Sequence, residues 1–411
     1  MSTDQEINDR LVAKWRNTFD TRVFGASENP FGVAGVLNQY IFDNHQRPYL
    51  DFTAAGGTMP LGQGYALVSE GITELVKFFY QTASYGQHIH GVQMEFIGAI
   101  EGYFEEGNKF LFTASEGDAF HTVVQMVRDQ HHRDADGFIL AVNRSSFPAG
   151  LDMVGIGSYD ETNPMTAAQL RDRAKYGDIS SLLVSPINPD TYEVISPELL
   201  QTAIDLSAEL NIPIIWDETV QGMGWMDGMF RIPHYADYIV LGGALGGGIP
   251  LGAVVGKNLY QLDTPDSVTR LSGSSLAFAA GLHAYRGIMH LKRLKGQPEI
   301  TGLLNDELDK LHEQFPEVIA GLTGESLLRG VVFKDPSFAR QFVQQCREDG
   351  ILLMRPSSGG RVVRIAAPMV CSLSDVEELA GAMLAAILKV RANDDRRRSE
   401  GSEATGNGAS G

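Results

Sequence analysis

The sequence predicts an α/β fold with a mostly parallel sheet in a large domain and a smaller α+β domain towards the C-terminus. Two observations carry this prediction. Short apolar runs alternate with amphipathic helical patterns over most of the chain, and such alternation is typical of βαβ units whose parallel sheet is covered on both faces. Near Thr269 the pattern changes to long helices, followed by short strands such as RVVRIAAP and a last helix after Ser372. This change of pattern indicates the second domain.

Each element is predicted from its residue pattern. Helices are expected where apolar residues recur every three or four positions, as in Tyr65–Thr82, in GDAFHTVVQMVRDQ and in PELLQTAIDLSAELN. Strands are expected where short runs rich in Val, Ile, Leu and Phe lie between turn residues. In chain order the strands are PYLDFTAA (an extended segment), Asn108–Ser115, Gly137–Val142, Ser180–Ile187, Ile212–Glu218, Asp237–Gly242 and Gly252–Gly256.

The chain divides into four predicted segments. Residues 1–50 form an N-terminal segment, residues 51–285 the large domain and residues 286–391 the small domain. Residues 392–411, ANDDRRRSEGSEATGNGASG, have no apolar periodicity and are rich in Gly, Ser and charge. This composition predicts a disordered tail.

Composition excludes several classes of partner. The 411 residues include 33 Lys and Arg against 51 Asp and Glu, which gives a formal net charge of −18. Such a surface repels phosphate backbones and anionic lipids, so neither nucleic acid nor a membrane is an expected partner. No apolar run approaches the roughly 20 residues that a membrane helix needs. With only two cysteines, Cys346 and Cys371, and no apolar signal segment, a cytoplasmic location is expected.

Two strand ends are candidate sites. Ligands bind beyond the carboxyl ends of parallel strands, where Asp217 with Glu218 follows one strand. An isolated acidic pair is also typical of a helix cap or a loop salt bridge. In FTASEGDAF a helix begins directly after a strand, with Ser115 and Asp118 in an S-x-x-D capping pattern and Gly117 between them. The free N–H groups there could hold a phosphate, or the segment could be a plain capped helix.

A third candidate is the glycine-rich segment Leu241–Gly256, LGGALGGGIPLGAVVG, which has seven glycines in sixteen residues. So many glycines cost conformational entropy, so sharp turns or close approach to a ligand are expected here. The spacing fits neither the P-loop nor the dinucleotide-binding fingerprint.

These three segments, in this order, resemble the class III aminotransferases, a family of fold type I that depends on pyridoxal phosphate. FTASEGDAFHTVVQMVR is similar to the family's phosphate loop FTNSGTEAVEAALKLAR. IIWDETVQGMGWMDGMF resembles DEVQTGFGRTGKMF, and LLMRPSSGGRVVRIAAP resembles LLRPSG…IRLAPP. The resemblance runs from about Leu50 to Leu388. It implies a fold type I enzyme whose site forms between the two subunits of a homodimer.

The departures from the family pattern bear on chemistry. In the family the segment GKALGGGLPLGAV carries the Schiff-base lysine, and the resemblance aligns Gly243 with it. ALGGG and PLGAV fix that register on both sides. A glycine has no amine, so it can form no aldimine and cannot act as a base. The resemblance also places Val220, Ser185 and Trp225 where the family has Gln, Glu and Arg.

The resemblance implies the following site residues. Asp217 pairs with the ring nitrogen of the cofactor and is a catalytic candidate, and His88 and His90 could replace the lysine as base. The histidines share one face if their segment is extended, although a lone histidine is more often a surface or core residue. Cofactor-binding residues are Ser115, Glu116, Gly117, Phe147, Asp217, Val220 and Gly243; substrate-binding residues are Arg364, Arg355 and Trp225. The two arginines could instead form a salt bridge between domains, and no cluster has metal-ligand spacing.

The sequence therefore predicts a diverged class III aminotransferase-like enzyme that acts on a small amino or keto compound, in specialised (natural-product) biosynthesis, without a lysine aldimine. Pyridoxal or pyridoxamine phosphate, if used, would be held without a covalent link. One alternative is a non-catalytic subunit that partners an intact aminotransferase. The other is a cofactor-independent lyase, cyclase or isomerase that reuses the pocket.

Overall fold

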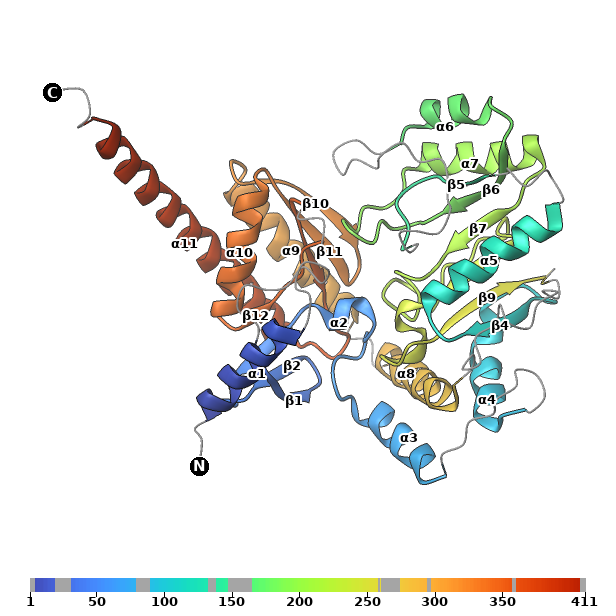
Figure 1. The fold of residues 1–411 in the computed structure, drawn as a ribbon, viewed down its shortest axis with the longest axis horizontal. Helices are drawn as coiled ribbons and strands as arrows, with labels where there is room; N and C mark the ends of the chain where they lie inside the picture. The colour runs from blue at the N-terminus through green and yellow to red at the C-terminus, as the bar shows by residue number, and fades with distance from the viewer. Residues whose placement is uncertain are drawn as a thin grey trace.

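The structure, a computed structural model, describes residues 4–18, 31–78, 89–131, 138–146, 165–257, 259, 274–293, 297–356 and 360–406. These residues form a large α/β body and a smaller α+β body beside it, with the N-terminal strands packed next to the smaller one (Figure 1). Within these ranges no helix is both long and apolar enough to cross a membrane.

A six-stranded sheet forms the centre of the large body, in the order β4-β9-β8-β7-β6-β5. Strands β5 to β8 are parallel, and β9 is antiparallel to both of its neighbours, β8 and β4. Strand β4 therefore runs in the same direction as β5 to β8. The strands are β4 (Lys109–Thr113), β5 (Phe138–Ala141), β6 (Ile179–Val184), β7 (Ile214–Asp217), β8 (Tyr238–Leu241) and β9 (Gly252–Gly256).

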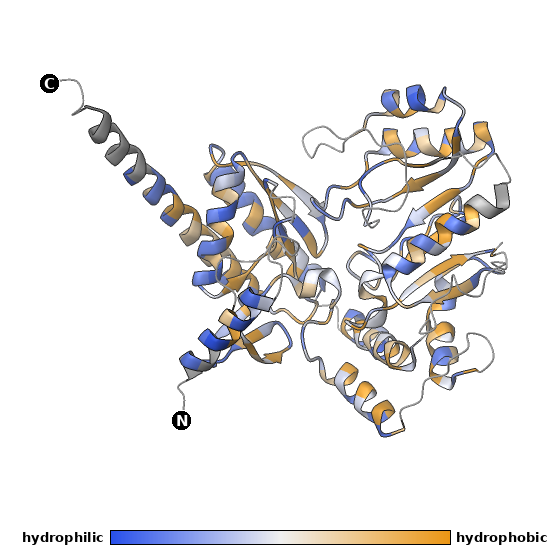
Figure 2. Cartoon of the chain, in the orientation of Figure 1, coloured by the Kyte–Doolittle hydropathy of each residue, from blue (hydrophilic) through white to orange (hydrophobic). Residues whose placement is uncertain are grey.

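Helices cover both faces of this sheet, which confirms the predicted fold class. Successive strand residues point to opposite faces, so Leu182 and Leu183 of β6 belong to two separate apolar clusters. Helix α5 (Glu116–His131) packs on one face through Phe120 and Val123. The other face is covered by α7 (Pro197–Leu210) and by α8 (Ser275–Arg293), whose buried residues share one cluster with Leu182. Figure 2 shows the apolar strands between helices of mixed polarity.

The remaining helices of the large body lie around this core. Helices α3 and α4 pack against α8, and α6 packs against α7. Their bounds are α3 (Ala66–Lys77), α4 (Gly91–Ile100), η1 (Glu101–Tyr103), α6 (Ala167–Ala174) and η2 (Gly243–Gly246).

The N-terminal strands pair with the C-terminal part of the chain. β12 lies parallel to β3 in a four-stranded sheet of order β1-β2-β3-β12. The elements are α1 (Asp4–Thr18), β1 (Val33–Leu37), β2 (Tyr40–Asp43), β3 (Pro48–Asp51), α2 (Ala54–Gly57) and β12 (Ile351–Leu352). The N-terminal segment is therefore joined to the smaller body through the backbone.

The smaller body contains a three-stranded antiparallel sheet of order β10-β11-β13, next to three helices. Its elements are α9 (Gln297–Gln314), β10 (Ile319–Glu325), β11 (Leu328–Phe333), α10 (Pro336–Glu348), β13 (Val362–Ala366) and α11 (Leu373–Gly406).

Helix α11 differs from the expected disordered tail, because it continues to Gly406. Its first half is anchored by the buried residues Val376, Leu379 and Met383. A helix with such a nucleus extends at little further cost, since each added residue gains one backbone hydrogen bond. The segment 391–406 contains no proline that would stop it.

Candidate active site

Five strands of the central sheet end at one edge, and a residue of the site lies at or just after the end of each. Glu116 comes after β4, Ser146 after β5, Ser185 after β6, Asp217 at the end of β7 and Gly243 after β8. The carboxyl edge of such a sheet is where α/β proteins bind ligands. The structure thus brings together Glu116, Asp217 and Gly243, three of the residues that the sequence analysis assigns to the site.

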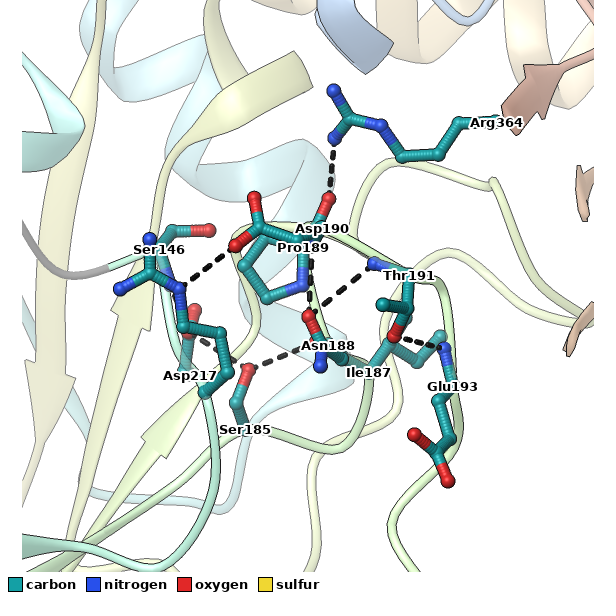
Figure 3. A network of polar contacts seen from close by, with 11 residues as sticks. Ser146, Ser185, Ile187, Asn188, Pro189, Asp190, Thr191, Glu193, Asp217 and Arg364 are labelled. Carbon is teal, nitrogen blue, oxygen red and sulfur yellow. Dashed lines mark hydrogen bonds and ion pairs between the residues drawn. The ribbon is translucent and has the colours of Figure 1, made fainter. Parts of the chain in front are cut away.

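Asp217 is completely buried, and protein donors surround its carboxylate. The backbone N–H and the hydroxyl of Thr219 donate to Oδ1 over 3.0 and 2.6 Å. The hydroxyl of Ser185 and the backbone N–H of Ser146 donate to Oδ2 over 2.9 and 3.2 Å (Figure 3). Each carboxylate oxygen thus accepts from one backbone N–H, whereas the Ser185 and Thr219 hydroxyls each also lie 3.0 Å from a second acceptor, the Ile187 carbonyl and the Ser146 hydroxyl.

Helix α5 begins directly after β4 with a side-chain cap. The Ser115 hydroxyl accepts a hydrogen bond of 3.2 Å from the backbone N–H of Asp118, and it donates one of 2.9 Å to the Asp118 carboxylate. This confirms the S-x-x-D capping pattern. The cap leaves Glu116 as the first residue of the helix, followed by Gly117.

The Glu116 side chain reaches back across the strand ends. Its Oε2 accepts a hydrogen bond of 2.8 Å from the backbone N–H of Gly243, and the carboxyl also hydrogen bonds to the Ser146 side chain. The hydroxyls of Ser146 and Thr219 hydrogen bond over 3.0 Å, and Thr219 contacts Asp217. Two hydroxyls therefore connect the carboxyl groups of Glu116 and Asp217.

This environment changes the acidity of Glu116. Burial raises the pKa of Glu116 from its ordinary value of 4.5 to about 7, and the nearby charge of Asp217 raises it further, while the hydrogen bonds from Gly243 and Ser146 act in the opposite direction. Near neutral pH the carboxyl therefore exists in both its protonated and its ionised form.

Gly243 has no space for a side chain. Its φ of +52° lies in the left-handed region that favours glycine, and a Cβ atom built on it would overlap the carbonyl oxygen of Thr219. On Gly242 a Cβ atom would lie 2.7 Å from both Cβ and Cγ of Glu116. The Glu116 side chain thus occupies the space that these two glycines leave open.

Glu218, named beside Asp217 in the sequence, lies outside this group. It is buried, and it accepts hydrogen bonds from Trp216 Nε1 (2.9 Å), Gln221 Nε2 (2.6 Å) and the backbone N–H of Arg231 (2.7 Å). Burial raises the pKa of Glu218 from 4.5 to about 7. Its contacts tie together the segment 216–231 that follows β7.

Three of the other predicted residues make none of the hydrogen bonds to Asp217. Val220 is half-buried against the main core, and His90 is buried at the N-cap position of α4. The Trp225 indole is buried and donates to the carbonyl of Gly57 over 2.8 Å. Two further predicted residues, His88 and Phe147, lie outside the described residues.

The two arginines lie in the smaller body. Arg364, on β13, donates to the carbonyl oxygen of Pro189 (Figure 3). Its guanidinium lies 5.6 Å from the centre of the Tyr192 ring. Arg355 donates from Nε and Nη2 to the carbonyl of Gly360 over 3.3 and 3.2 Å. Arg364 therefore connects the two bodies at the loop after β6.

Sequence reasoning missed Ser146 and Thr219, which connect the two carboxyl groups. The available signal was their position, because each lies within a few residues of a strand's carboxyl end. Among the described residues, no group of three or more His, Cys, Asp or Glu side chains could hold a metal ion.

The model of the aminotransferase class III family matches residues 113–387. The chain belongs to the class III aminotransferase family. It is 24% identical over 364 residues to the acetylornithine aminotransferase of Gloeobacter violaceus, a match that covers 82% of this chain and 88% of that protein. It is 23% identical over 422 residues to the diaminobutyrate–2-oxoglutarate aminotransferase of Rhizobium meliloti, covering 87% and 88%.

Solved structures of class III aminotransferases share the fold. The ornithine delta-aminotransferase of Plasmodium falciparum superposes with a TM-score of 0.78 at 18% identity, covering 95% of this chain and 99% of that one. The acetylornithine aminotransferase of Elizabethkingia anophelis gives 0.74 at 20% identity, covering 93% and 99%. These likenesses confirm fold type I.

The class III aminotransferase homologues imply pyridoxal phosphate as the cofactor, but the described residues of this chain do not fit it. A phosphate at the start of α5 would meet the acidic side chains of Glu116 and Asp118 in the first turn. A ring nitrogen at Asp217 would find both carboxylate oxygens already bonded. Gly243, which the resemblance aligns with the Schiff-base lysine, has no amine. The residues at these three positions therefore do not fit the cofactor in the way that the resemblance implies.

Proposed function

We propose that this class III aminotransferase-like chain is an enzyme that acts on a small amino or keto compound without a lysine aldimine. The observation that carries the proposal is the conformation of Gly243, the position that the sequence resemblance assigns to the Schiff-base lysine. Its left-handed φ and the Thr219 carbonyl leave no room for a side chain.

The hydrogen bonds that the Asp217 carboxylate accepts within the protein favour a reaction without the cofactor. They count against one in which pyridoxal or pyridoxamine phosphate is held non-covalently. A pyridine nitrogen could reach this carboxylate only by displacing a donor such as Ser185 or Ser146. The displaced group would then need a new partner, at a cost of about 1–3 kcal/mol. We therefore favour a cofactor-independent lyase, cyclase or isomerase, with the non-covalent form as the competing possibility.

The substrate class rests on the relatives. Their names refer to acetylornithine, diaminobutyrate and 2-oxoglutarate, all small amino or keto compounds. Membership of a specialised biosynthetic pathway is proposed on the departures at Gly243, Val220 and Trp225 alone. A cytoplasmic location is proposed from the composition.

We also propose a homodimer, as the family resemblance implies. The described surface offers an apolar area for it around α3, where Leu67, Val76 and Phe78 are exposed. A neighbouring apolar groove is lined by Leu61 and Ile249, among other residues. Large exposed apolar surface of this kind is typical of protein interfaces.

The proposed function can be tested by adding pyridoxal phosphate to the purified protein. We expect no aldimine absorption band, and borohydride reduction with peptide mass mapping should find no stoichiometric pyridoxyl-lysine. A single fully modified lysine, for example Lys257, would contradict the proposal. Saturable binding without reduction would favour the non-covalent form. A protein that binds no small amino or keto compound at all would instead favour the non-catalytic partner subunit.

A further inference from the structure

We propose that Glu116 is the proton donor and acceptor of this site, hydrogen bonded to the backbone of Gly243, the residue that the resemblance aligns with the Schiff-base lysine. The inference rests on the proposed function and names the group that performs its chemistry. The Glu116 carboxyl lies between the backbone N–H of Gly243 on one side and the Ser146 hydroxyl on the other.

The surrounding chain holds this carboxyl in a defined place. The glycines at 242 and 243 provide the space, since a Cβ atom at Gly242 would lie 2.7 Å from Glu116 Cγ. Hydrogen bonds from Gly243 and Ser146 fix the orientation of the carboxyl group. Glu116 is nevertheless only half-buried, whereas Asp217 is fully enclosed. Of the two acids, Glu116 is therefore the less enclosed.

A chain of hydroxyl groups extends from Glu116 into the protein. Ser146 bonds to Glu116, Thr219 bonds to Ser146 over 3.0 Å, and Thr219 donates to Asp217 over 2.6 Å. Each hydroxyl has one proton to donate, so Thr219 can donate either to Ser146 or to Asp217, and the protonation of Glu116 decides which of these bonds it makes. Asp217 itself is completely buried and accepts a backbone N–H on each carboxylate oxygen.

The charged groups around Glu116 favour its protonated form. Asp217 faces it from the end of β7, and Asp118 lies in the same turn of α5, bonded to Ser115. Arg144, the cation nearest in sequence to Ser146, is exposed and paired with Asp190 at 2.9 Å. The segments after β6 and β8 bring Ser185 and Gly243, which are uncharged. A pKa of about 7 gives the carboxyl useful amounts of both forms at neutral pH.

With a 2-oxo compound as substrate, the proposed reaction is the transfer of a proton between carbon and Glu116. The Glu116 carboxylate takes a proton from the carbon next to the carbonyl: the C–H bond breaks, an O–H bond forms on Glu116, and the electron pair moves towards the carbonyl oxygen to give an enolate. Return of the proton to the same carbon restores the starting compound, and its return elsewhere gives an isomer. No oxidant or reductant is needed.

The experiment uses 2-oxoglutarate as the probe and follows deuterium incorporation at C3 by NMR in D₂O. We expect the full-length protein to catalyse exchange at a rate that rises with pH and levels off above about 7, because the ionised carboxyl is the base. Glu116→Gln should lower the rate by a factor of about 100 or more. Glu116→Asp keeps a titrating carboxyl and should recover part of the rate, whereas Glu377→Gln, on the exposed face of α11, should equal the wild type.

The outcomes separate this inference from the proposed function. Ser146→Ala keeps Glu116 but removes the first hydroxyl of the chain, so it should shift the midpoint of the pH profile while exchange persists. No exchange by the wild type, or equal exchange by Glu116→Gln, would overturn the role of Glu116. Stoichiometric pyridoxyl-lysine would overturn the proposed function instead, whatever the exchange results.

Discussion

The carboxyl of Glu116 accepts a 2.8 Å hydrogen bond from the backbone N–H of Gly243, a residue 127 positions further along the chain. The resemblance aligns Gly243 with a lysine and Glu116 with a glycine of the family's phosphate loop, and the structure places these two residues in direct contact. The glutamate fills the space that the glycines at 242 and 243 leave open, and the glycine backbone offers its N–H to the glutamate. The two departures are therefore physically linked.

The first prediction concerns the space at Gly243. Gly243→Ala should lower the free energy of unfolding by about 2–4 kcal/mol, since its Cβ would overlap the Thr219 carbonyl and a left-handed φ disfavours alanine. Gly98→Ala is the matched control. It lies on the exposed side of α4 with nothing within 4 Å of a new Cβ, so it should stabilise by roughly 0.5–1 kcal/mol. Urea denaturation of both variants measures the difference, and a neutral Gly243→Ala would contradict the described backbone.

The second prediction concerns Asp217. Asp217→Ala removes the acceptor of four hydrogen bonds and leaves the buried N–H of Thr219 without its partner. We expect a loss of about 3–5 kcal/mol in the free energy of unfolding. Asp205→Ala, on the solvent side of α7, removes a 3.3 Å surface pair with Arg171 and a 2.9 Å hydrogen bond from Gln201, and should cost less than about 1 kcal/mol. A fully stable Asp217→Ala protein would indicate that the carboxylate is held for a ligand rather than for the fold.

The third prediction is a fall in stability as pH rises. The pKa values of Glu116 and Glu218 are each raised from 4.5 to about 7 in the folded state, in each case chiefly by burial. Between these pH values the folded protein holds protons that the unfolded chain has released, so this contribution is complete below about 4.5 and is lost as pH rises through 7. Each group contributes about 3 kcal/mol at most.

The pH dependence can be assigned by substitution. Glu116→Gln and Glu218→Gln should each flatten the change in unfolding free energy between pH 5 and pH 7.5, measured in urea at fixed salt. Because other groups titrate in the same range, the informative quantity is the difference between wild type and variant at each pH. Parallel curves for the wild type and Glu116→Gln would indicate an ordinary pKa for this residue.

Much of the sheet could be predicted because its strands are buried on both faces. Continuous apolar runs predicted Ile212–Glu218 and Gly252–Gly256, and the structure has β7 at Ile214–Asp217 and β9 at Gly252–Gly256. The cap of Ser115 on Asp118 is also a local pattern, with its two members three residues apart. Local patterns of this kind are visible in sequence because the interacting groups are neighbours.

The contacts that define the site are not local, and this is why the sequence did not reveal them. The reach of Glu116 to Gly243 depends on the order of strands in the sheet and on one side-chain conformation. The pairing of β12 with β3 joins segments some 300 residues apart through a strand of two residues. The sequence position of Trp225, a few residues after an acidic strand end, is compatible both with a pocket wall and with the core. Only the structure shows that its indole donates to the carbonyl of Gly57.

The last prediction separates the two ways in which Glu116 opposes pyridoxal phosphate. Its side chain takes up space between Gly243 and Ser146, and its ionised form repels a phosphate group. Two like charges 4 Å apart repel by about 4 kcal/mol near a protein surface, whereas a side chain in the way excludes the ring whatever its charge.

Glu116→Gln removes the charge and keeps the size, and Glu116→Ser removes both. Titration of each protein with pyridoxal phosphate, followed by absorbance, should give weak binding for the wild type and a tenfold or greater gain for Glu116→Ser, equal to about 1.4 kcal/mol. If Glu116→Gln gains as much as Glu116→Ser, charge is the barrier; if it gains little, the occupied space is. Wild-type binding as tight as that of Glu116→Ser would contradict both, because the carboxyl would then have to leave the hydrogen bond with Gly243 at no measurable cost.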